Sequence, residues 1–392
     1  MMKLAVIFES SPFDRKGLFN AVHERIRHLV RYGECSIDAY CIHSRDNALT
    51  RMKRHTPVVP KVDDVTVDDI RYRILWYDFS VTDHVTVEIL NRRPLLFSRF
   101  MDRCMPLFKG YDAVLAHSFT GGLFALEISE RFGIPYFVTW HGSDIHTHPW
   151  RNPLIMKWTR KVMKGASCNF YVSEALKNLS QRISSDVAKD VLYNGVADFF
   201  VRFSEQDREC QRRTFGLEEG TKVVAFVGSL VSVKNPELLQ PLFHEIRRRY
   251  EGGLEFWVVG DGKLRQHVEP ALLSDSSIEV RMWGNMASDM MPLIMNCMDV
   301  LILPSRNEGL PLVCAEAIRC GAYAVGADVG GVAEVVGKDN VIPHGDGFIG
   351  SMASKVVSVL NDGGIQTVPA HLDWRVTAEK EMSFIRAIRQ GS

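Results

Sequence analysis

The amino-acid sequence predicts an α/β protein built from two doubly wound units. Short apolar runs recur along the 392 residues with helical patterns between them, which is typical of parallel sheets made of βαβ units. The pattern also starts afresh near the middle, where the apolar run 222–227 leads into Gly228 much as the run 4–8 opens the chain. The length exceeds that of one ordinary domain. We therefore expect one parallel sheet in each half.

The first half contains apolar runs that we expect to form parallel strands, at 4–8, 113–116, 136–139 and 169–172. The segment 67–76 alternates between apolar and polar residues, which favours an antiparallel or edge strand. A helix is expected between Gly17 and Gly33, because apolar residues there recur at helical spacing. Its apolar face consists of Phe19, Val22, Ile26, Leu29 and Val30.

The second half repeats this organisation, with expected strands at 222–227, 256–259, 280–283, 300–303 and 322–326. The boundary between the halves is expected after Asn194-Gly195-Val196, because a turn dipeptide is followed there by the polar stretch 204–213. The sequence therefore predicts domains at 1–196 and 197–373, with a last helix from about Trp374 onward.

The composition excludes several classes of protein. Lys plus Arg and Asp plus Glu both number 47, so nothing indicates nucleic-acid binding. The eight cysteines form no CxxC pair, which predicts buried free thiols in a reducing compartment. The apolar run at the start is too short for a signal peptide, and no apolar run is long enough to span a bilayer. We expect a cytoplasmic protein.

Two features bear on a membrane surface. Residues 1–195 carry 27 Lys and Arg against 21 Asp and Glu, a mild basic excess. The segment 149–164 has the pattern of a basic amphipathic helix. Such a helix either packs its apolar face on a sheet, which we favour, or meets anionic lipid at the inner face of a membrane.

The stretch 305–317 is the most informative part of the chain. It follows the apolar run 300–303 and opens a helix, so its free backbone amides can hold an anion, and Gly309 lets the backbone come close. Glu308 and Glu316 are poorly suited to facing an anion and better suited to accepting hydrogen bonds from hydroxyls. This combination suits a sugar attached to a diphosphate. Alternatively, Glu316 is only an acid that favours the start of a helix.

The residues from Pro304 to Ala317 read PSxxEGLPLxxxEA and are followed by Gly330-Gly331-x-x-Glu334. This resembles the donor-site signature of the retaining glycosyltransferases of family 4, which have the GT-B fold: two Rossmann-like domains facing across a cleft. The resemblance implies that Glu308 contacts the donor sugar and that Glu316 holds the ribose diol. It implies that the amides of Gly309 and Leu310 meet the sugar and the diphosphate.

Three positions before this stretch extend the resemblance. Lys234 stands in a GxLxxxKN setting after Gly228, which resembles the family's diphosphate lysine. The family usually has an arginine directly after that glycine, whereas this chain has Ser229, so one phosphate contact is missing or supplied elsewhere. Gly260 and Trp283 end two further strands, and the resemblance places them near the nucleotide and its base; plain turn chemistry is the alternative.

On the first domain, Trp140-His141-Gly142-Ser143-Asp144 resembles the family's HGxD, whose histidine meets the donor sugar near the reacting centre. His141 is therefore a candidate catalytic residue with Glu308 and Lys234, and a satisfied core histidine is the alternative. Asp144 and Gly17 are the acceptor-side candidates, although the family often has a pair of glycines where Gly17 stands.

A rival interpretation of the same region is a metal site. His141, Asp144, His146 and His148 lie close in sequence and are of the types that bind zinc or iron. Their spacing matches no helix-spaced ligand pair, so surface or loop histidines are the simpler interpretation and no metal is expected.

The resemblance implies a retaining, metal-independent glycosyltransferase without a cofactor. Its donor would be a nucleotide-diphosphate sugar, with UDP or GDP as the nucleotide. Its acceptor would be a glycan, a lipid-linked molecule or a small molecule, as in the biosynthesis of polysaccharides, glycolipids or glycoconjugates. The last helix, 374–392, would cross back onto the first domain. Alternatives are a sugar-nucleotide epimerase, a metal-dependent hydrolase using the His141 cluster, and a non-catalytic subunit that binds nucleotide sugars.

Overall fold

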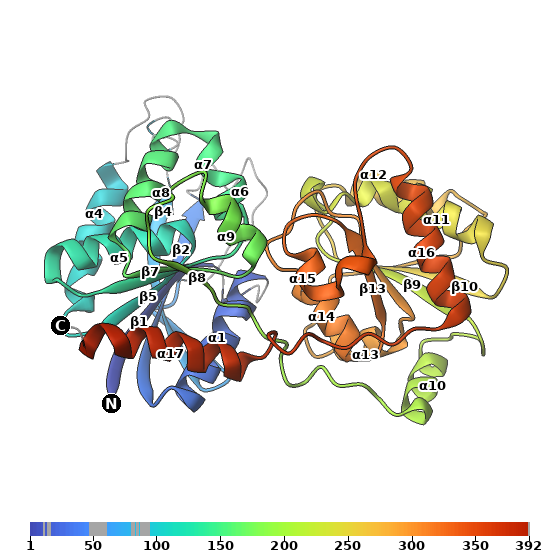
Figure 1. The fold of residues 1–392 in the computed structure, drawn as a ribbon, viewed down its shortest axis with the longest axis horizontal. Helices are drawn as coiled ribbons and strands as arrows, with labels where there is room; N and C mark the ends of the chain where they lie inside the picture. Colours follow the sequence, from blue (N-terminus) through green and yellow to red (C-terminus); the bar gives the residue numbers. More distant parts are fainter. Residues whose placement is uncertain are drawn as a thin grey trace. The chain divides into compact units, whose positions relative to one another are not determined.

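The computed structural model describes residues 1–10, 12–13, 17–46, 61–79, 83, 86 and 95–390. Within them the chain forms two compact α/β units (Figure 1). Unit 1 combines Met1–Asn194 with Trp374–Ser392, and unit 2 is Gly195–Asp373. Each unit has one mainly parallel sheet flanked by helices, so the prediction of two doubly wound units is confirmed.

The sheet of unit 1 has the order β3-β4-β2-β1-β5-β6-β7-β8. Its strands are β1 (Met2–Glu9), β2 (Cys35–Asp46), β3 (Asp64–Val67), β4 (Ile70–Phe79), β5 (Ala113–His117), β6 (Tyr136–Trp140), β7 (Cys168–Tyr171) and β8 (Lys189–Val191). All neighbouring strands are parallel except β3 and β4. Two of these strands, β2 and β8, were not expected from the sequence.

The alternating segment 67–76 is divided between two strands. Val67 ends β3, Asp68 and Asp69 adopt left-handed φ angles of 45° and 65°, and Ile70 begins β4. Aspartate tolerates this conformation because its short side chain can bond locally, so the two residues form the tight turn of a hairpin. The expected antiparallel pairing is present between β3 and β4, but β4, which holds most of the segment, lies inside the sheet and is parallel to β2, so the edge strand is β3.

The helices of unit 1 are α1 (Leu18–Tyr32), α4 (Leu95–Cys104), η1 (Met105–Phe108), α5 (Ser118–Phe132), α6 (Ser143–His146), α7 (His148–Arg151), α8 (Pro153–Gly165), α9 (Glu174–Ser180) and α17 (Trp374–Gln390). In α1 the expected face is buried except at Val30, which is 50% exposed. The expected helix 149–164 is divided between α7 and α8, because Asn152 leaves the helical conformation and its side chain caps α8 by accepting a hydrogen bond from Leu154.

The sheet of unit 2 has the order β11-β10-β9-β12-β13-β14 and is parallel throughout. Its strands are β9 (Lys222–Val227), β10 (Leu254–Val259), β11 (Val280–Gly284), β12 (Val300–Leu303), β13 (Tyr323–Ala327) and β14 (Val341–Ile342). Its helices are α10 (Glu205–Thr214), η2 (Ser232–Lys234), η3 (Pro236–Leu238), α11 (Leu239–Arg249), α12 (Arg265–Leu273), α13 (Met291–Cys297), α14 (Leu312–Arg319), α15 (Val332–Val336), η4 (Lys338–Asn340) and α16 (Phe348–Asp362).

Helix α17 brings the end of the chain onto unit 1. Glu381 forms an ion pair with Arg25 of α1, with 3.0 Å between Oε2 and Nε, and both side chains are only 1% exposed. The Arg25 guanidinium also donates to Thr139 of β6, and Phe384 packs on the ring of Phe170. Burial lowers the pKa of Arg25 and raises that of Glu381, and the charge of each partner opposes the shift of the other.

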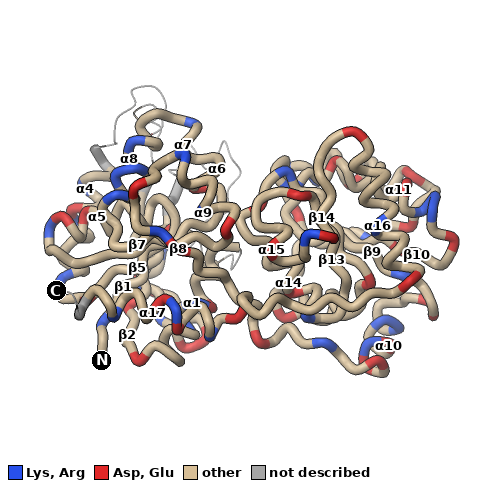
Figure 2. Tube along the Cα trace, in the orientation of Figure 1, with Lys and Arg blue, Asp and Glu red and all other residues tan. Residues whose placement is uncertain are grey.

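The charged residues and the cysteines are distributed as follows. Figure 2 shows Lys and Arg interspersed with Asp and Glu along both units. All eight cysteines are free; Cys210 is exposed and the others are buried. Among the described residues, no helix combines the length and the apolar character that crossing a membrane requires.

Candidate functional site

The strand order of unit 2 reverses between β9 and β12. Strands β10 and β11 extend the sheet on one side of this pair, and β13 and β14 extend it on the other. The connections that leave the carboxyl ends of two such strands diverge, which opens a crevice where ligands bind in doubly wound sheets. The segments at this point are 228–235 after β9 and 304–311 after β12.

Lys234 and Glu308 meet at this point. The Lys234 ammonium donates to both carboxylate oxygens of Glu308, at 2.7 and 2.9 Å, and the Ser305 hydroxyl donates to Oε1 at 2.6 Å. Glu308 is 8% exposed and Ser305 is fully buried. The structure therefore brings together two of the candidate residues as one hydrogen-bonded group with a fixed carboxylate.

Asn235 ties the two segments to each other. It adopts a left-handed conformation (φ 55°) that ends the short helix carrying Lys234. Its side-chain amide donates to the carbonyl of Pro304 (3.3 Å), while its side-chain oxygen accepts from Nε of Arg306 (3.0 Å). The amide of Arg306 in turn donates to the carbonyl of Val233 (2.8 Å). The position of Lys234 relative to Glu308 is thus set by the Asn235 side chain and by one backbone hydrogen bond.

Two glycines allow close backbone approach at the same edge. A Cβ on Gly330, whose φ is 51°, would lie 1.8 Å from the carbonyl oxygen of Glu308. A Cβ on Gly260, whose φ is 129°, would lie 2.1 Å from the carbonyl oxygen of Gly228. Only glycine fits either place, because the contact atom is backbone and the φ disfavours side chains. Gly228 and Gly260 therefore shape the edge through their backbones.

Glu316 lies on α14, which begins at Leu312. It is half-buried, and burial raises its pKa to about 7. Within the described part of the chain, its carboxyl group has no hydrogen-bonding or ion-pair partner. The amides of Gly309 and Leu310, which precede the helix, likewise donate to no described group. An acceptor and two donors are thus available for a ligand.

The side chain of Trp283 lies in an aromatic cluster. Its indole packs on Phe215 and Trp257, each with 5.1 Å between ring centroids, and the guanidinium of Arg281 lies over its ring. Its Nε1 is buried without a hydrogen-bond partner among the described groups. Next to it, the carbonyl of Gly284 accepts from the amide of Gly260 (2.7 Å). The side chain is therefore used in packing, and the backbone beside it reaches the edge.

In unit 1, polar side chains gather where β1, β5 and β6 end. Thr120 donates to Glu9 (2.6 Å) across the point where the strand order reverses between β1 and β5. The ring of His141 follows β6, and its Nε2 lies 3.0 Å from Nδ1 of His117, the last residue of β5. Sequence reasoning missed His117, because a single histidine after an apolar strand carries no distinguishing pattern.

The carboxylate of Asp144 accepts hydrogen bonds from backbone amides of its own loop. Its carboxylate accepts from the amide of Gly142 (2.9 Å) and from that of His141 (3.2 Å to each oxygen). Gly142 has φ 150° and ψ −84°, a conformation that favours glycine. Burial raises the pKa of Asp144, and the amide hydrogen bonds oppose that shift. Asp144 thus holds the shape of the turn that carries His141.

The metal interpretation finds no geometric support. His146 has its Nδ1 3.0 Å from the hydroxyl of Thr147, His148 packs edge-on against Phe119, and Asp144 faces backbone amides. Among the described residues, no three His, Cys, Asp or Glu side chains are grouped so that they could hold a metal ion. The His141 cluster is therefore close in sequence without forming a ligand set.

Gly17, the remaining acceptor-side candidate, stands at the start of α1. Its φ is 45°, it is exposed, and its carbonyl accepts from the amide of Ala21 (3.2 Å). The charged residues directly before it lie outside the described residues.

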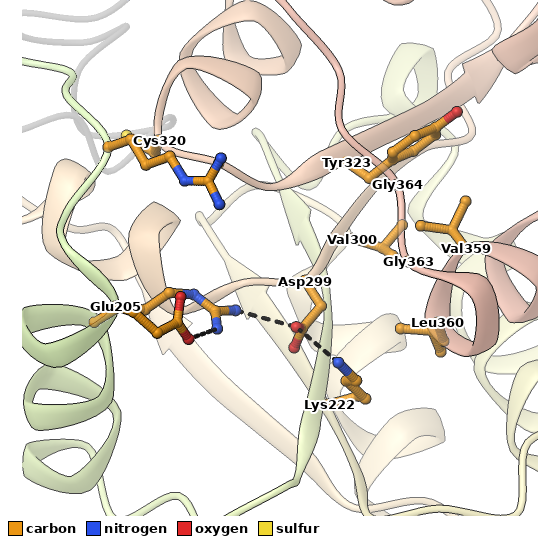
Figure 3. Close-up of a pocket in the computed structure, with 13 residues that line it drawn as sticks. Glu205, Lys222, Asp299, Val300, Cys320, Tyr323, Val359, Leu360, Gly363 and Gly364 are labelled. Atoms are coloured by element: carbon orange, nitrogen blue, oxygen red, sulfur yellow. Dashed lines mark hydrogen bonds and ion pairs between the residues drawn. The ribbon is translucent and has the colours of Figure 1, made fainter.

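A cavity of about 160 Å³ lies at the amino ends of the strands of unit 2 (Figure 3). Lys234 and Glu308 follow the carboxyl ends of β9 and β12, at the opposite edge of the sheet. Asp299 is the centre of its charges and pairs with Arg208 (3.0 Å) and Lys222 (3.6 Å). Asp299 also accepts a hydrogen bond from the amide of Val223 in β9. Through its ion pair with Arg208, it therefore ties α10 to the sheet. This ion-pair cluster is structural and was not expected from the sequence.

Comparison with known proteins gives the class. A family model described as "Glycosyl transferases group 1" matches residues 221–362, and one described as "Glycosyl transferase 4-like domain" matches residues 50–195. An uncharacterized glycosyltransferase of Methanocaldococcus jannaschii is 27% identical over 306 residues, covering 73% of this chain and 76% of the relative. A 2-deoxystreptamine N-acetyl-D-glucosaminyltransferase of Streptomyces fradiae is 28% identical over 270 residues, covering 62% of each.

Solved structures agree on the fold. Sucrose-phosphate synthase from Thermosynechococcus elongatus has a TM-score of 0.71 at 15% identity, covering 99% of this chain and 94% of the other. Anabaena HepE in complex with UDP-glucose has a TM-score of 0.66 at 17% identity, covering 100% and 99%.

Two Rossmann-like units, each with its polar loops at the carboxyl ends of a parallel sheet, define the GT-B fold. Both family models name glycosyl transfer and the Methanocaldococcus jannaschii relative of similar length is a glycosyltransferase, so the comparisons support a glycosyltransferase with the GT-B fold.

Proposed function

We propose that this glycosyltransferase moves a sugar from a nucleotide-diphosphate sugar to an acceptor hydroxyl with retention of configuration and without a metal ion. The donor site is the edge of unit 2 formed by Lys234, Glu308, Gly309, Leu310 and Glu316. The observation that carries this proposal is the combination there of a fixed cation–carboxylate pair with two amides and a carboxyl group that have no hydrogen-bonding partner among the described residues.

Each group matches one part of such a donor. The amides of Gly309 and Leu310 and the ammonium of Lys234 offer donors to the diphosphate. The carboxylate of Glu308 accepts from sugar hydroxyls, and that of Glu316 accepts from the ribose diol. Anabaena HepE is in complex with UDP and with UDP-glucose, which supports a uridine diphosphate sugar as the donor we propose; a guanosine diphosphate sugar is the alternative.

The reaction requires positioning and charge stabilisation more than acid–base chemistry. The acceptor hydroxyl attacks on the face that the diphosphate leaves, and a phosphate oxygen of the donor takes its proton. Lys234 and the two amides stabilise the charge that develops on the leaving diphosphate. His141 supplies a ring nitrogen to a hydroxyl of the reacting sugar. Glu308 is held by Lys234 and Ser305, so it is suited to a fixed hydrogen-bond acceptor rather than to a nucleophile.

Thermal stability in the presence of ligands tests the donor site. The purified protein is screened against UDP, GDP, ADP, dTDP and their sugar conjugates, with and without EDTA. Stabilisation by one nucleotide that survives EDTA and is lost in Glu316→Gln supports the proposal. No shift with any nucleotide, or a shift only with metal, contradicts it. Consumption of the donor without any acceptor would instead indicate an epimerase.

A further inference from the structure

The two histidines of unit 1 form a direct ring-to-ring contact. Nδ1 of His117 lies 3.0 Å from Nε2 of His141, and the ring centroids are 5.3 Å apart. A hydrogen bond between two imidazole nitrogens needs one N–H and one lone pair, so exactly one proton lies between these two atoms when the bond is formed. The contact therefore couples the tautomer of one ring to that of the other.

The surroundings keep both rings neutral. His117 is 1% exposed, and burial together with the nearby charge of Arg25 holds the pKa of both rings down, to about 3 for His141. Among the described residues, no carboxylate hydrogen-bonds to either ring, because Asp144 faces backbone amides and Glu381 faces Arg25. A neutral His141 has one donor nitrogen and one acceptor nitrogen, and the hydrogen bond ties that assignment to the tautomer of His117.

His117 provides a rigid base for this contact. It ends β5, its ring meets the edge of Phe8 with 6.4 Å between centroids, and the chain turns sharply after it because Ser118 has a φ of 61°. His141 is only half-buried, and no described residue hydrogen-bonds to its Nδ1. A flip of the His141 ring would replace Nε2 by carbon and leave Nδ1 of His117 without its partner.

We propose that His117 is a positioning residue that holds the His141 ring in one orientation and one tautomer, so that Nδ1 of His141 is presented to the donor sugar. The part of this inference that concerns the sugar rests on the proposed transferase function; the tautomer does not. His117 acts through His141 and contacts no substrate itself.

The tautomer is measured directly by NMR on protein labelled with ring-15N histidine, without ligand at neutral pH, with His141→Gln identifying the His141 signals. In the wild type, one ring nitrogen of His141 is protonated and the other is not, which gives two well-separated nitrogen signals. His117→Phe removes the partner at similar volume, so the two signals should move toward each other as both tautomers become populated. The exposed His267→Asn is the matched control and should leave the His141 signals unchanged.

Two polar variants sharpen the test and replace His117→Phe if that variant fails to fold. The amide of His117→Asn reaches about the place of Nδ1 and should keep the wild-type separation of signals. The amide of His117→Gln extends one carbon further and should not. Averaged signals in the wild type, or an unchanged separation in both His117→Phe and His117→Gln, would overturn the inference.

Kinetics give the second readout once a donor is identified. His117→Gln should lower kcat by about tenfold or more while KM for the donor changes little, and His117→Asn should recover most of the loss. An unchanged kcat in His117→Gln would overturn the positioning role. If no nucleotide sugar binds, the proposed function fails, whereas the NMR result on the tautomer is unaffected, so the two failures are distinguishable.

Discussion

The ammonium of Lys234 bridges both carboxylate oxygens of Glu308, at 2.7 and 2.9 Å, although the residues are 74 positions apart in the sequence. Neither charge is therefore independent of the other. A donor that enters this site meets a neutralised pair, and any ligand contact with Lys234 is made while Glu308 shares the same ammonium. This changes what single substitutions should do.

Lys234→Met should weaken binding of the donor by roughly 2 to 3 kcal/mol, because the diphosphate loses a cation and Glu308 becomes a buried charge without its partner. The double variant Lys234→Met/Glu308→Gln should lose less than the sum of the single losses, since no unpaired charge remains. Calorimetry on the four proteins measures this coupling, with the exposed Lys338→Met as control. Strictly additive losses would show that the pair does not act as a unit.

Binding of the donor should strengthen as pH rises toward about 7. Burial raises the pKa of Glu316 to about 7, and the ribose diol donates to the ionised form, so bound donor lowers this pKa and displaces a proton. The affinity should therefore increase with pH up to about 7, the pKa of the free site, and level off above it. A nucleotide sugar is the correct probe, because its diphosphate has no ionisation in this window. Glu316→Gln should abolish the dependence, and a slope that persists in that variant would assign it elsewhere.

Protein stability should show the opposite trend from the same carboxyl group. Its folded pKa lies above the ordinary value of 4.5, so between about pH 4.5 and 7 the folded state binds more protons than the unfolded state. The stability of unit 2 should fall across this window by about 1 to 3 kcal/mol, and Glu316→Gln should flatten that fall. Thermal melting of the two ligand-free proteins at several pH values measures it; parallel curves would mean that Glu316 titrates normally.

Gly330→Ala should reduce the affinity for the donor, in addition to the stability that it costs through backbone conformation. The added Cβ would collide with the carbonyl oxygen of Glu308 and must displace the segment that holds this residue. Gly220 also has a positive φ, of 80°, but open space around it, so Gly220→Ala carries only the conformational cost of roughly 1 to 2 kcal/mol. The difference in donor affinity between the two variants isolates the contact, and equal affinities would remove Gly330 from the site.

Glu381→Leu should destabilise unit 1 by roughly 3 to 5 kcal/mol, because it leaves the buried charge of Arg25 unpaired. Arg25→Met/Glu381→Leu should recover much of that loss, since the two apolar side chains fill similar space without a charge. The melting transition of unit 1 measures both effects. A double variant that is no more stable than Glu381→Leu would mean that shape, rather than charge, governs this contact.

The sequence predicted most where information is local. The run Val300–Leu303 is a strand to the residue, because a short continuous apolar run that ends at a proline is consistent with a buried strand and is too short for a helix. Within 67–76, periodicity alone could not locate the turn at Asp68-Asp69, since the alternation continues on both sides of it. The strand β2 carries polar residues among its apolar ones and was missed for that reason.

The candidate site was predictable as a set of residues and not as a geometry. Glu308, Gly309 and Glu316 belong to one short motif, whereas the pairing of Glu308 with Lys234 depends on the adjacency of β9 and β12. The role of Asp144 as a support of its own turn, and the packing of the Trp283 indole on Phe215, depend on side-chain directions that spacing does not define. No sequence pattern around His117 marked it as a site residue.

The ion pair between Arg25 and Glu381 has a consequence for synthesis on the ribosome. The chain emerges from its N-terminus, so Arg25 leaves the ribosome long before Glu381 is made, while the whole of unit 2 lies between them. Unit 2 is continuous in sequence and has all its strands available earlier. We expect it to complete its fold first, and unit 1 to wait, with an uncompensated arginine, for the last helix to arrive. Nascent chains that stop before residue 381 should therefore be the forms most exposed to chaperones and proteases.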